Sequence, residues 1–156
     1  MLRWLWLSVV VVALDQASKM WASASLQFQE PVAVIPFFNL TLMHNYGAAF
    51  SFLAGAGGWQ RWFFAAIALT VSIAITLWLR RLGQNQRWEA ASLALVLGGA
   101  LGNFWDRLTL GYVVDFFDVY YDVHHWPAFN IADSAITVGA VMLVIDMLFR
   151  QRHGNA

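Results

Sequence analysis

The chain has 156 residues, of which 60% are hydrophobic and only 12% are charged, and its formal net charge is zero. Soluble domains are about 45–50% apolar and about 25% charged, so this composition indicates an integral membrane protein. The neutral charge balance gives no reason to expect a nucleic-acid partner. The absence of cysteine excludes disulfides and thiolate metal sites.

Four apolar segments approach the length of about 20 residues that a membrane span needs. The first covers roughly residues 3–22 and begins with "WLWLSVVVVAL". Arg3, this apolar run and the small residues "ASA" at 22–24 also fit a secretory signal peptide with its cleavage site. Asp15 and Lys19 interrupt the stretch between the run and that site, which favours a helix that is retained.

The region that follows, roughly residues 23–59, contains "PVAVIPFFNLTLMHN" at 31–45. Its β-branched and aromatic residues, with turn residues nearby, predict short strands. "GAGG" at 55–58 indicates a loop before the second apolar segment.

The second segment, roughly residues 60–80, contains the uncharged run "WFFAAIALTVSIAITLWL", and the third covers roughly residues 88–106. Between the third and fourth segments lies a region of roughly residues 107–130. Its stretch "GYVVDFFDVYYDV" is strand-like in composition. The aspartates of that stretch would also share one face of a helix, so its form stays open; they are Asp115, Asp118 and Asp122.

The fourth segment covers roughly residues 131–150 and completes a predicted bundle of four transmembrane helices with a small extracytoplasmic β-containing region. Six of the nine Lys and Arg residues fall on one side if all four segments span the membrane. The positive-inside rule then places both termini in the cytoplasm and residues 23–59 and 107–130 outside. The six are Arg3, Arg80, Arg81, Arg87, Arg150 and Arg152.

Polar residues from three segments fall at one depth in this arrangement. A helix rises 1.5 Å per residue, so Asp15 lies roughly 18 Å along the first helix, in its outer half. Asn103 and Asp106 lie roughly 22 and 27 Å along the third helix, also toward the outer face. Asp133 falls in the first turn of the fourth helix, at the same level. Because polar groups inside a bilayer are costly, this convergence predicts a functional site.

Each of these residues also has a purely structural interpretation. Asp15 and Lys19 are spaced for a helical i,i+4 ion pair. Asp106 would be part of a solvated helix end. Asp133 would be a charge at the positive end of a helix, with Asn130 as its N-cap. Asp118, Asp122 and Asp146 would be solvated or interfacial carboxylates.

Few kinds of hydrolytic chemistry fit this set of residues. No serine lies in a G-x-S-x-G motif, and H-E-x-x-H is absent. His44, His124 and His125 match no usual metal-ligand spacing. Two aspartates that share a proton are another route to peptide hydrolysis. Asp133 is a good candidate by position, and the residues alone leave its partner open among Asp15, Asp106, Asp115, Asp118 and Asp122.

Five motifs in order give the chain a specific resemblance. They are "LDQASK", "NYGAAFSF", "GALGNFWDR", "GYVVDF" and "PAFNIADS", and they cover nearly the whole length. With them the chain resembles the bacterial lipoprotein signal peptidases (signal peptidase II), which are membrane aspartic peptidases with four transmembrane helices and a small outer sheet.

The resemblance implies a role for particular residues. The family's catalytic pair falls on Asp115 and Asp133. Asp15 and Lys19 match a supporting polar pair of the first helix, and Tyr46 stands where the family commonly has Thr. Polar residues that line the site and hold the substrate backbone match Asn45, Asn103, Arg107 and Asn130. A helix N-terminus favours an ionised Asp133, and an apolar stretch favours a neutral Asp115, so we expect Asp133 as the base and Asp115 as the acid.

The resemblance also implies a function and a location. The chain is expected to cut the signal peptide from prolipoproteins just before a diacylglyceryl-modified cysteine, in the bacterial inner membrane and near its outer face. No metal or organic cofactor is implied. A small transporter is an alternative because of the intramembrane Asp and Lys residues, although no inverted repeat is visible. A presenilin-type protease is another, although "YVV" rather than G-x-G precedes Asp115.

Overall fold

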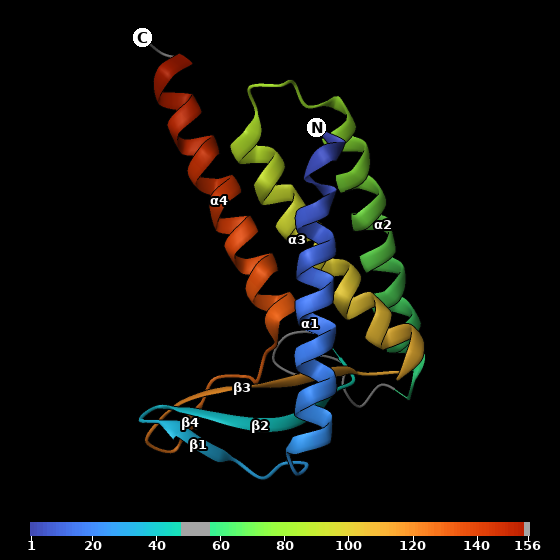
Figure 1. Cartoon of the computed structure of the whole chain (residues 1–156), viewed down its shortest axis with the longest axis vertical. Helices are drawn as coiled ribbons and strands as arrows, with labels where there is room; N and C mark the ends of the chain where they lie inside the picture. The colour runs from blue at the N-terminus through green and yellow to red at the C-terminus, as the bar shows by residue number, and fades with distance from the viewer. Residues whose placement is uncertain (48–56, 155–156) are drawn as a thin grey trace.

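In a computed structural model, the described residues form four long helices, which run along the long axis of the molecule (Figure 1). The structure describes residues 1–47 and 57–154, with side chains as far as residue 148. After a short 3-10 turn at Leu2–Trp4, the helices are α1 (Leu5–Ser25), α2 (Trp59–Arg81), α3 (Arg87–Thr109) and α4 (Ile131–Gly154). Each predicted apolar segment therefore contains a helix, although α1, α3 and α4 run three or four residues further than expected at their C-terminal ends.

The four helices differ in how apolar they are. Within the described residues, Trp59–Arg81 and Ile131–Leu148 are long and apolar enough to cross a bilayer, as judged by length and composition. The other two helices are of similar length, but polar residues near their sheet-proximal ends lower their hydropathy. Several of those polar residues are buried against one another, so part of the difference comes from the site that α1 and α3 help to build.

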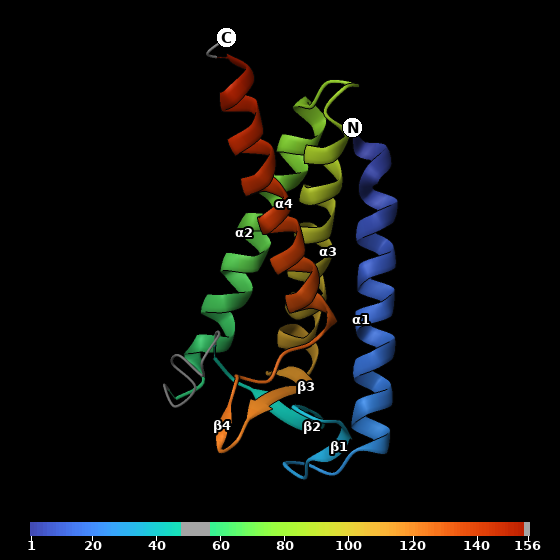
Figure 2. The same cartoon turned by 90° about the vertical axis from the view of Figure 1, so that its left-hand side faces the viewer.

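A four-stranded antiparallel sheet crosses one end of the bundle (Figure 2). Its strands, in spatial order, are β1 (Val32–Ile35), β2 (Phe38–Asn45), β3 (Val113–Tyr121) and β4 (His124–His125). The predicted strands within 31–45 are confirmed, and the form left open at 111–123 is a strand. Asp115 lies opposite Met43 in the β2–β3 register, so pairing between distant segments brings this carboxylate under the helices.

Helix α3 packs against the other three helices, and glycines permit the closest contacts. A Cβ on Gly98 would lie 2.7 Å from Cβ of Val11 on α1. A Cβ on Gly99 would collide with the carbonyl oxygen of Ala132 on α4. Small residues of this kind let membrane helices approach each other closely.

Two apolar clusters lie on either side of the buried polar residues Asp15, Lys19, Asn103 and Asp106, which we call the polar layer. One joins α2 and α3 through Leu79, Leu93 and their neighbours. The other joins α1 to the sheet through Ala22 and Phe116, together with Leu42 and Val114. On α1, the buried polar residues Asp15 and Lys19 lie between Leu5, which packs against the first cluster, and Ala22 of the second.

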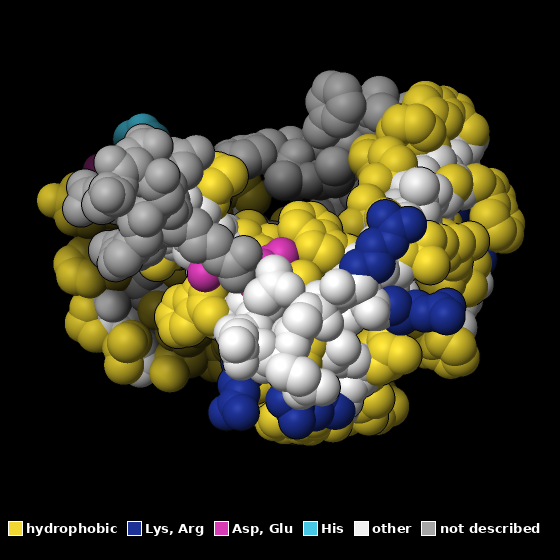
Figure 3. Space-filling view, turned by 90° about the horizontal axis from the view of Figure 1, so that it is seen from above, with side chains coloured by type: hydrophobic (Ala, Val, Ile, Leu, Met, Phe, Trp, Pro, Cys, Tyr) yellow, Lys and Arg dark blue, Asp and Glu magenta, His cyan; other side chains and the backbone are white. Residues whose placement is uncertain are grey.

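Basic side chains gather at the end of the bundle opposite the sheet, where the N-terminus and the end of α4 both lie (Figures 1 and 3). Arg80 and Arg81 end α2, and Arg87 begins α3. The side chains of Arg150 and Arg152 lie outside the described residues, as do residues 48–52 of "NYGAAFSF" and 55–56 of "GAGG".

Candidate active site

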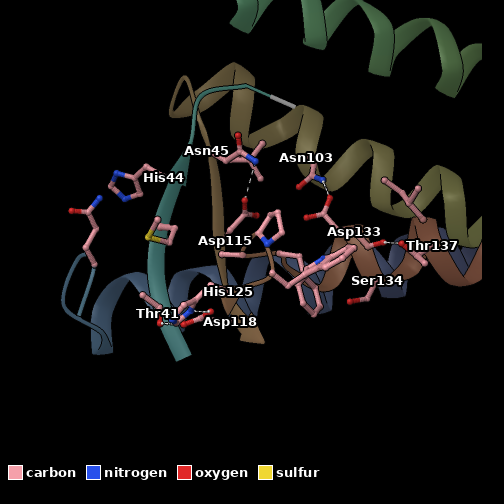
Figure 4. Close-up of a pocket in the computed structure, with 18 of the residues that line it drawn as sticks. Thr41, His44, Asn45, Asn103, Asp115, Asp118, His125, Asp133, Ser134 and Thr137 are labelled. Atoms are coloured by element: carbon pink, nitrogen blue, oxygen red, sulfur yellow. Dashed lines mark hydrogen bonds and ion pairs between the residues drawn. The ribbon is translucent and has the colours of Figure 1, made fainter. Parts of the chain in front are cut away.

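A cavity of about 1110 Å³ lies where the sheet meets α3 and α4. Figure 4 shows Asp115, Asn45, Asn103 and Asp133 near one another in this cavity, while Thr41, Asp118 and His125 form a separate group. The predicted site residues that line it are Asn45, Asn103, Arg107, Asp115 and Asp133. Asp15, Lys19 and Asn130 support them from behind.

Asp115 is a buried carboxylate held by two amides. It is 2% exposed in β3, and its Oδ2 accepts a hydrogen bond of 3.1 Å from Asn45 Nδ2. Its Oδ1 accepts a bond of 2.7 Å from Asn130 Nδ2. Burial and then the charge of Asp133 raise the pKa of Asp115 to about 7, against the opposing effects of the two amides and Lys19. Asp115 is therefore protonated below about pH 7 and loses its proton as the pH rises above it.

Asp133 lies in the first turn of α4 and forms a reciprocal cap with Asn130. The Asp133 backbone N–H donates to Asn130 Oδ1 at 2.9 Å, and the Asn130 backbone N–H donates to Asp133 Oδ2 at 3.3 Å. The structural interpretation of Asn130 as an N-cap is thus confirmed. Asp133 has a further contact, because its Oδ1 accepts a bond of 2.8 Å from Asn103 Nδ2 at the cavity wall.

Asn103 and Asn130 connect the two carboxylates. Asn130 Nδ2, which donates to Asp115, also lies 3.1 Å from Asn103 Oδ1. Asn103 Oδ1 accepts a second bond, of 2.9 Å, from Lys19 Nζ. These two donors fix the orientation of the Asn103 amide, so that its Nδ2 group points at Asp133. A short chain of hydrogen bonds therefore joins Asp115 to Asp133.

Arg107 places a positive charge at the cavity wall. Its guanidinium donates to the carbonyl oxygens of Asn103 at 3.2 Å and Gly47 at 3.1 Å. It also lies over the ring of Phe64, 5.5 Å from the centroid. Arg107 therefore ties α3 to the segment that directly follows β2 and faces the cavity with its charge.

Asp15 and Lys19 form the expected i,i+4 ion pair, at 2.8 Å. The pair is part of a larger cluster, because Lys19 Nζ also lies 2.8 Å from Asp106 Oδ2. The interpretation of Asp106 as a solvated helix end is wrong, since it is only 2% exposed. Gln16 joins the cluster through a 2.8 Å bond to Asp106 Oδ1. One feature of the sequence could have indicated that Asp106 is buried with the site residues: it lies three positions after Asn103, on the same face of the helix.

Asp118 is not the solvated carboxylate that its sequence context suggested. It is 6% exposed and accepts bonds from His125 at 2.7 Å, Thr41 at 3.0 Å and Asn39 at 3.3 Å. Burial raises the pKa of Asp118, but these hydrogen bonds outweigh burial and lower it. Asp122 does lie exposed, in the turn between β3 and β4.

Tyr46, which stands where a Thr is expected from the motif resemblance, leaves the site intact. Tyr46 is 48% exposed, and its ring lies 5.4 Å from that of Tyr112. The neighbouring Asn45 keeps its bond to Asp115. His44 also packs on Tyr112, with ring centroids 4.0 Å apart. Among the described residues, no three or more His, Cys, Asp or Glu side chains are grouped to hold a metal ion.

Comparisons with known proteins agree with the motifs. A family model described as "Signal peptidase (SPase) II" matches residues 7–149. A lipoprotein signal peptidase of Acinetobacter baumannii is 57% identical and covers 99% of this chain and 89% of its own. A lipoprotein signal peptidase of Pseudomonas fluorescens is 55% identical, and the match covers 99% of this chain and 92% of that protein. A solved bacterial membrane enzyme is 34% identical, with a TM-score of 0.85 over 96% of this chain and 89% of its own. A second solved bacterial membrane enzyme is 35% identical, with a TM-score of 0.80, and the match covers 94% of this chain and 92% of that chain.

Proposed function

The chain belongs to the signal peptidase II family, and from this premise we propose that it is an aspartic endopeptidase acting on prolipoproteins. It removes the signal peptide by cutting just before a cysteine that carries a diacylglyceryl group. The observation that carries the aspartic mechanism is the pair Asp115 and Asp133, joined by asparagine amides at the wall of one cavity. Family membership also favours a peptidase over a small carrier.

The two carboxylates have distinct tasks in the proposed reaction. Asp133, ionised, takes a proton from water as the water oxygen attacks the scissile carbonyl carbon. Asp115, protonated, donates its proton to the carbonyl oxygen, which gives a neutral tetrahedral intermediate. Collapse of this intermediate breaks the C–N bond: the proton held by Asp133 passes to the leaving amine, and ionised Asp115 takes a proton back from a hydroxyl group of the intermediate as the new carboxyl group forms. A pKa of about 7 for Asp115 supports its role as the acid at neutral pH.

The remaining cavity residues would hold the substrate. Arg107 and Asn45 face the cavity with donors suited to the carbonyl groups of an extended peptide. Asn103 and Asn130 keep the carboxylates in place through the bonds described above. This mechanism uses water and side chains of the chain itself, without a cofactor.

All four helices cross the bacterial inner membrane in the proposed arrangement, with both termini in the cytoplasm. Exposed apolar side chains such as Ile73 and Leu77 on α2 and Val141 and Val144 on α4 suit contact with lipid. The basic end of the bundle lies opposite the sheet, which supports an active site near the outer face. There the acyl chains of a lipidated cysteine would anchor the scissile bond at the level of the cavity.

A cleavage assay with the purified chain tests the proposal. A precursor with a diacylglyceryl cysteine is expected to be cut before that cysteine, and the same precursor without the lipid is expected to be cut poorly or not at all. Asp115→Asn and Asp133→Asn are each expected to lose roughly 10³-fold or more in rate, because acid–base help is lost. The double variant should be little worse than either single variant.

Two outcomes would contradict the proposal. Robust turnover by Asp115→Asn or by Asp133→Asn would reject the aspartate pair. Loss of wild-type activity with a chelator, restored by added zinc, would point to a metal mechanism instead. Asp122→Asn is the matched control, because this carboxylate is exposed in a turn away from the cavity lining and its loss should leave the rate unchanged.

A further inference from the structure

We propose that a buried cluster of Asp15, Lys19 and Asp106, the lysine cluster, positions both aspartates of the pair through the backbone on which each is carried. This inference rests on the proposed function and adds Asp106 and Lys19 as positioning residues. None of the three side chains lines the cavity.

Each carboxylate of the cluster holds the peptide N–H of the residue that directly precedes one of the paired aspartates. Asp15 Oδ1 accepts a bond of 2.9 Å from the N–H of Ala132, the residue before Asp133. Asp106 Oδ2 accepts a bond of 3.1 Å from the N–H of Val114, the residue before Asp115. The first turn of α4 and the start of β3 are thereby fixed to α1 and α3, respectively.

Lys19 joins these two contacts and adds a third. Its Nζ lies 2.8 Å from Asp15 Oδ2 and 2.8 Å from Asp106 Oδ2. The remaining N–H donates to Asn103 Oδ1 at 2.9 Å. Since an ammonium group has three donors, all of them are used. The third contact sets the Asn103 amide so that its other end donates to Asp133.

The construction of the cluster is costly. Asp15, Lys19 and Asp106 are 0%, 3% and 2% exposed. Gly102 leaves room for Asp15, because a Cβ at this position would lie 2.6 Å from Asp15 Oδ2. Apolar side chains of similar volume often stabilise a fold as well as a buried ion cluster does. Stability of the fold therefore does not explain why these charges are buried. Precise placement of two separate chain segments does explain it.

Placement matters for the reaction because acid–base catalysis needs both carboxylates within hydrogen-bond reach of one water and one carbonyl. A displacement of about 1 Å can cost roughly 10²-fold in rate. Asp115 is on a strand and Asp133 on a helix, and a segment of more than ten residues separates them in the chain. Lys19 contacts both Asp15 and Asp106, so one side chain fixes the position of the strand relative to the helix.

Lys19→Met in the full chain is the first test, with kcat, KM, their pH dependence and Tm measured together. We expect kcat to fall roughly 10- to 100-fold with KM within about threefold of wild type, because the cluster touches no substrate. The high-pH limb of the pH–rate profile should also shift to higher pH, because the charge of Lys19 lowers the pKa of Asp115 and the variant lacks this charge. Glu89→Gln is the matched control: Glu89 is another buried charge of α3, bonded to Trp78 and Gln86 at the other end of the helix.

Conservative variants keep the test decisive if Lys19→Met fails to fold. Asp106→Asn retains an oxygen to accept the Val114 N–H, whereas Asp106→Leu removes the acceptor. Asp106→Leu should lose more kcat than Asp106→Asn at equal amounts of folded protein. Equal kcat in these two variants, or a Lys19→Met variant with wild-type kcat and pH profile, would overturn the positioning role.

Two variants distinguish the role of the lysine cluster from that of the aspartate pair. Turnover by Asp115→Asn would reject the aspartate pair itself. An inactive Asp115→Asn together with a Lys19→Met variant that loses activity only in proportion to its folded fraction would leave the pair standing and reject the lysine cluster as a positioning device.

Discussion

Asn130 serves the helix and the site at once. Its Oδ1 caps α4 and its Nδ2 donates to Asp115, while the whole residue is inaccessible to solvent. The cap was predictable from local sequence, because Asn is a preferred N-cap and an acidic residue follows three positions later. The bond to Asp115 was not derivable from local rules, since it depends on where β3 pairs with β2. The motif resemblance implied only that Asn130 lines the site and holds the substrate backbone.

Asn130→Asp separates these two tasks. Aspartate caps a helix as well as asparagine does, so helix content should be unchanged. A second carboxylate beside Asp115 replaces a donor by a like charge, and should hold the pKa of Asp115 further above its usual range. We expect a loss of roughly 10²-fold in kcat near neutral pH. Circular dichroism and a pH–rate profile check both parts, and unchanged kcat with an unmoved profile would show that the bond is dispensable.

The proton on Asp115 makes stability depend on pH. The pKa of Asp115 rises from 3.8 to about 7 on folding, so the folded chain binds more protons than the unfolded chain between these values. Asp115 therefore costs stability as pH rises from about 4 to about 7, and the full cost is present above pH 7. Activity should fall in the same direction, above about pH 7, as the acid loses its proton.

Asp115→Asn removes this cost along with the activity. We expect the inactive variant to have a higher Tm than wild type at pH 8, by about 2–4 °C or more, and no advantage near pH 4. Thermal unfolding in detergent at both pH values measures the difference. An Asp115→Asn variant that is less stable than wild type at pH 8 would mean that the carboxylate is ionised and well satisfied in the folded chain.

At the scale of elements, α3 carries both the packing contacts of the bundle and half of the site. Its glycines meet α1 and α4, and Asn103 and Asp106 face the polar layer. The helix and its approximate bounds were predictable from its apolar length. Burial of Asp106 depends on Lys19 of another helix, and burial of Asp118 depends on Thr41 and His125. Local sequence carries no direct record of such partners, which is why both carboxylates were interpreted as solvated.

Gly99→Ala tests the packing of α3 on α4. The added methyl group would meet the Ala132 carbonyl and lie 2.7 Å from Ile136 Cγ1, so α4 has to move. We expect a loss of roughly 1–3 kcal/mol in stability. Activity should fall as well, because Ala132 directly precedes Asp133. Gly83→Ala is the control, since its methyl group would meet only Gln86 Oε1 at 3.4 Å. Equal Tm values for the two variants would contradict this account of the interface.

At the scale of the whole molecule, the absence of cysteine allows topology to be measured directly. Asn85 lies in the loop between α2 and α3, and Asp122 lies in the turn beyond β3; both are exposed. In intact spheroplasts, a membrane-impermeant maleimide should label Asp122→Cys and leave Asn85→Cys unlabelled until the membrane is opened. The reverse pattern would invert the proposed orientation, and labelling of both in intact spheroplasts would contradict the four-span arrangement.

The lysine cluster also bears on how such a chain is made. Among the described residues, α2 and the stretch Ile131–Leu148 of α4 are long and apolar enough to cross a bilayer, whereas α1 and α3 are not among the helices that meet this criterion. Lys19 is paired with Asp15 within α1, whereas Asp106 of α3 meets its partner charge only when α3 packs on α1. During synthesis α1 emerges first, so the partner of Asp106 is available when α3 follows. The residues that align the active site would therefore also make the stable insertion of α3 depend on α1 being in the membrane.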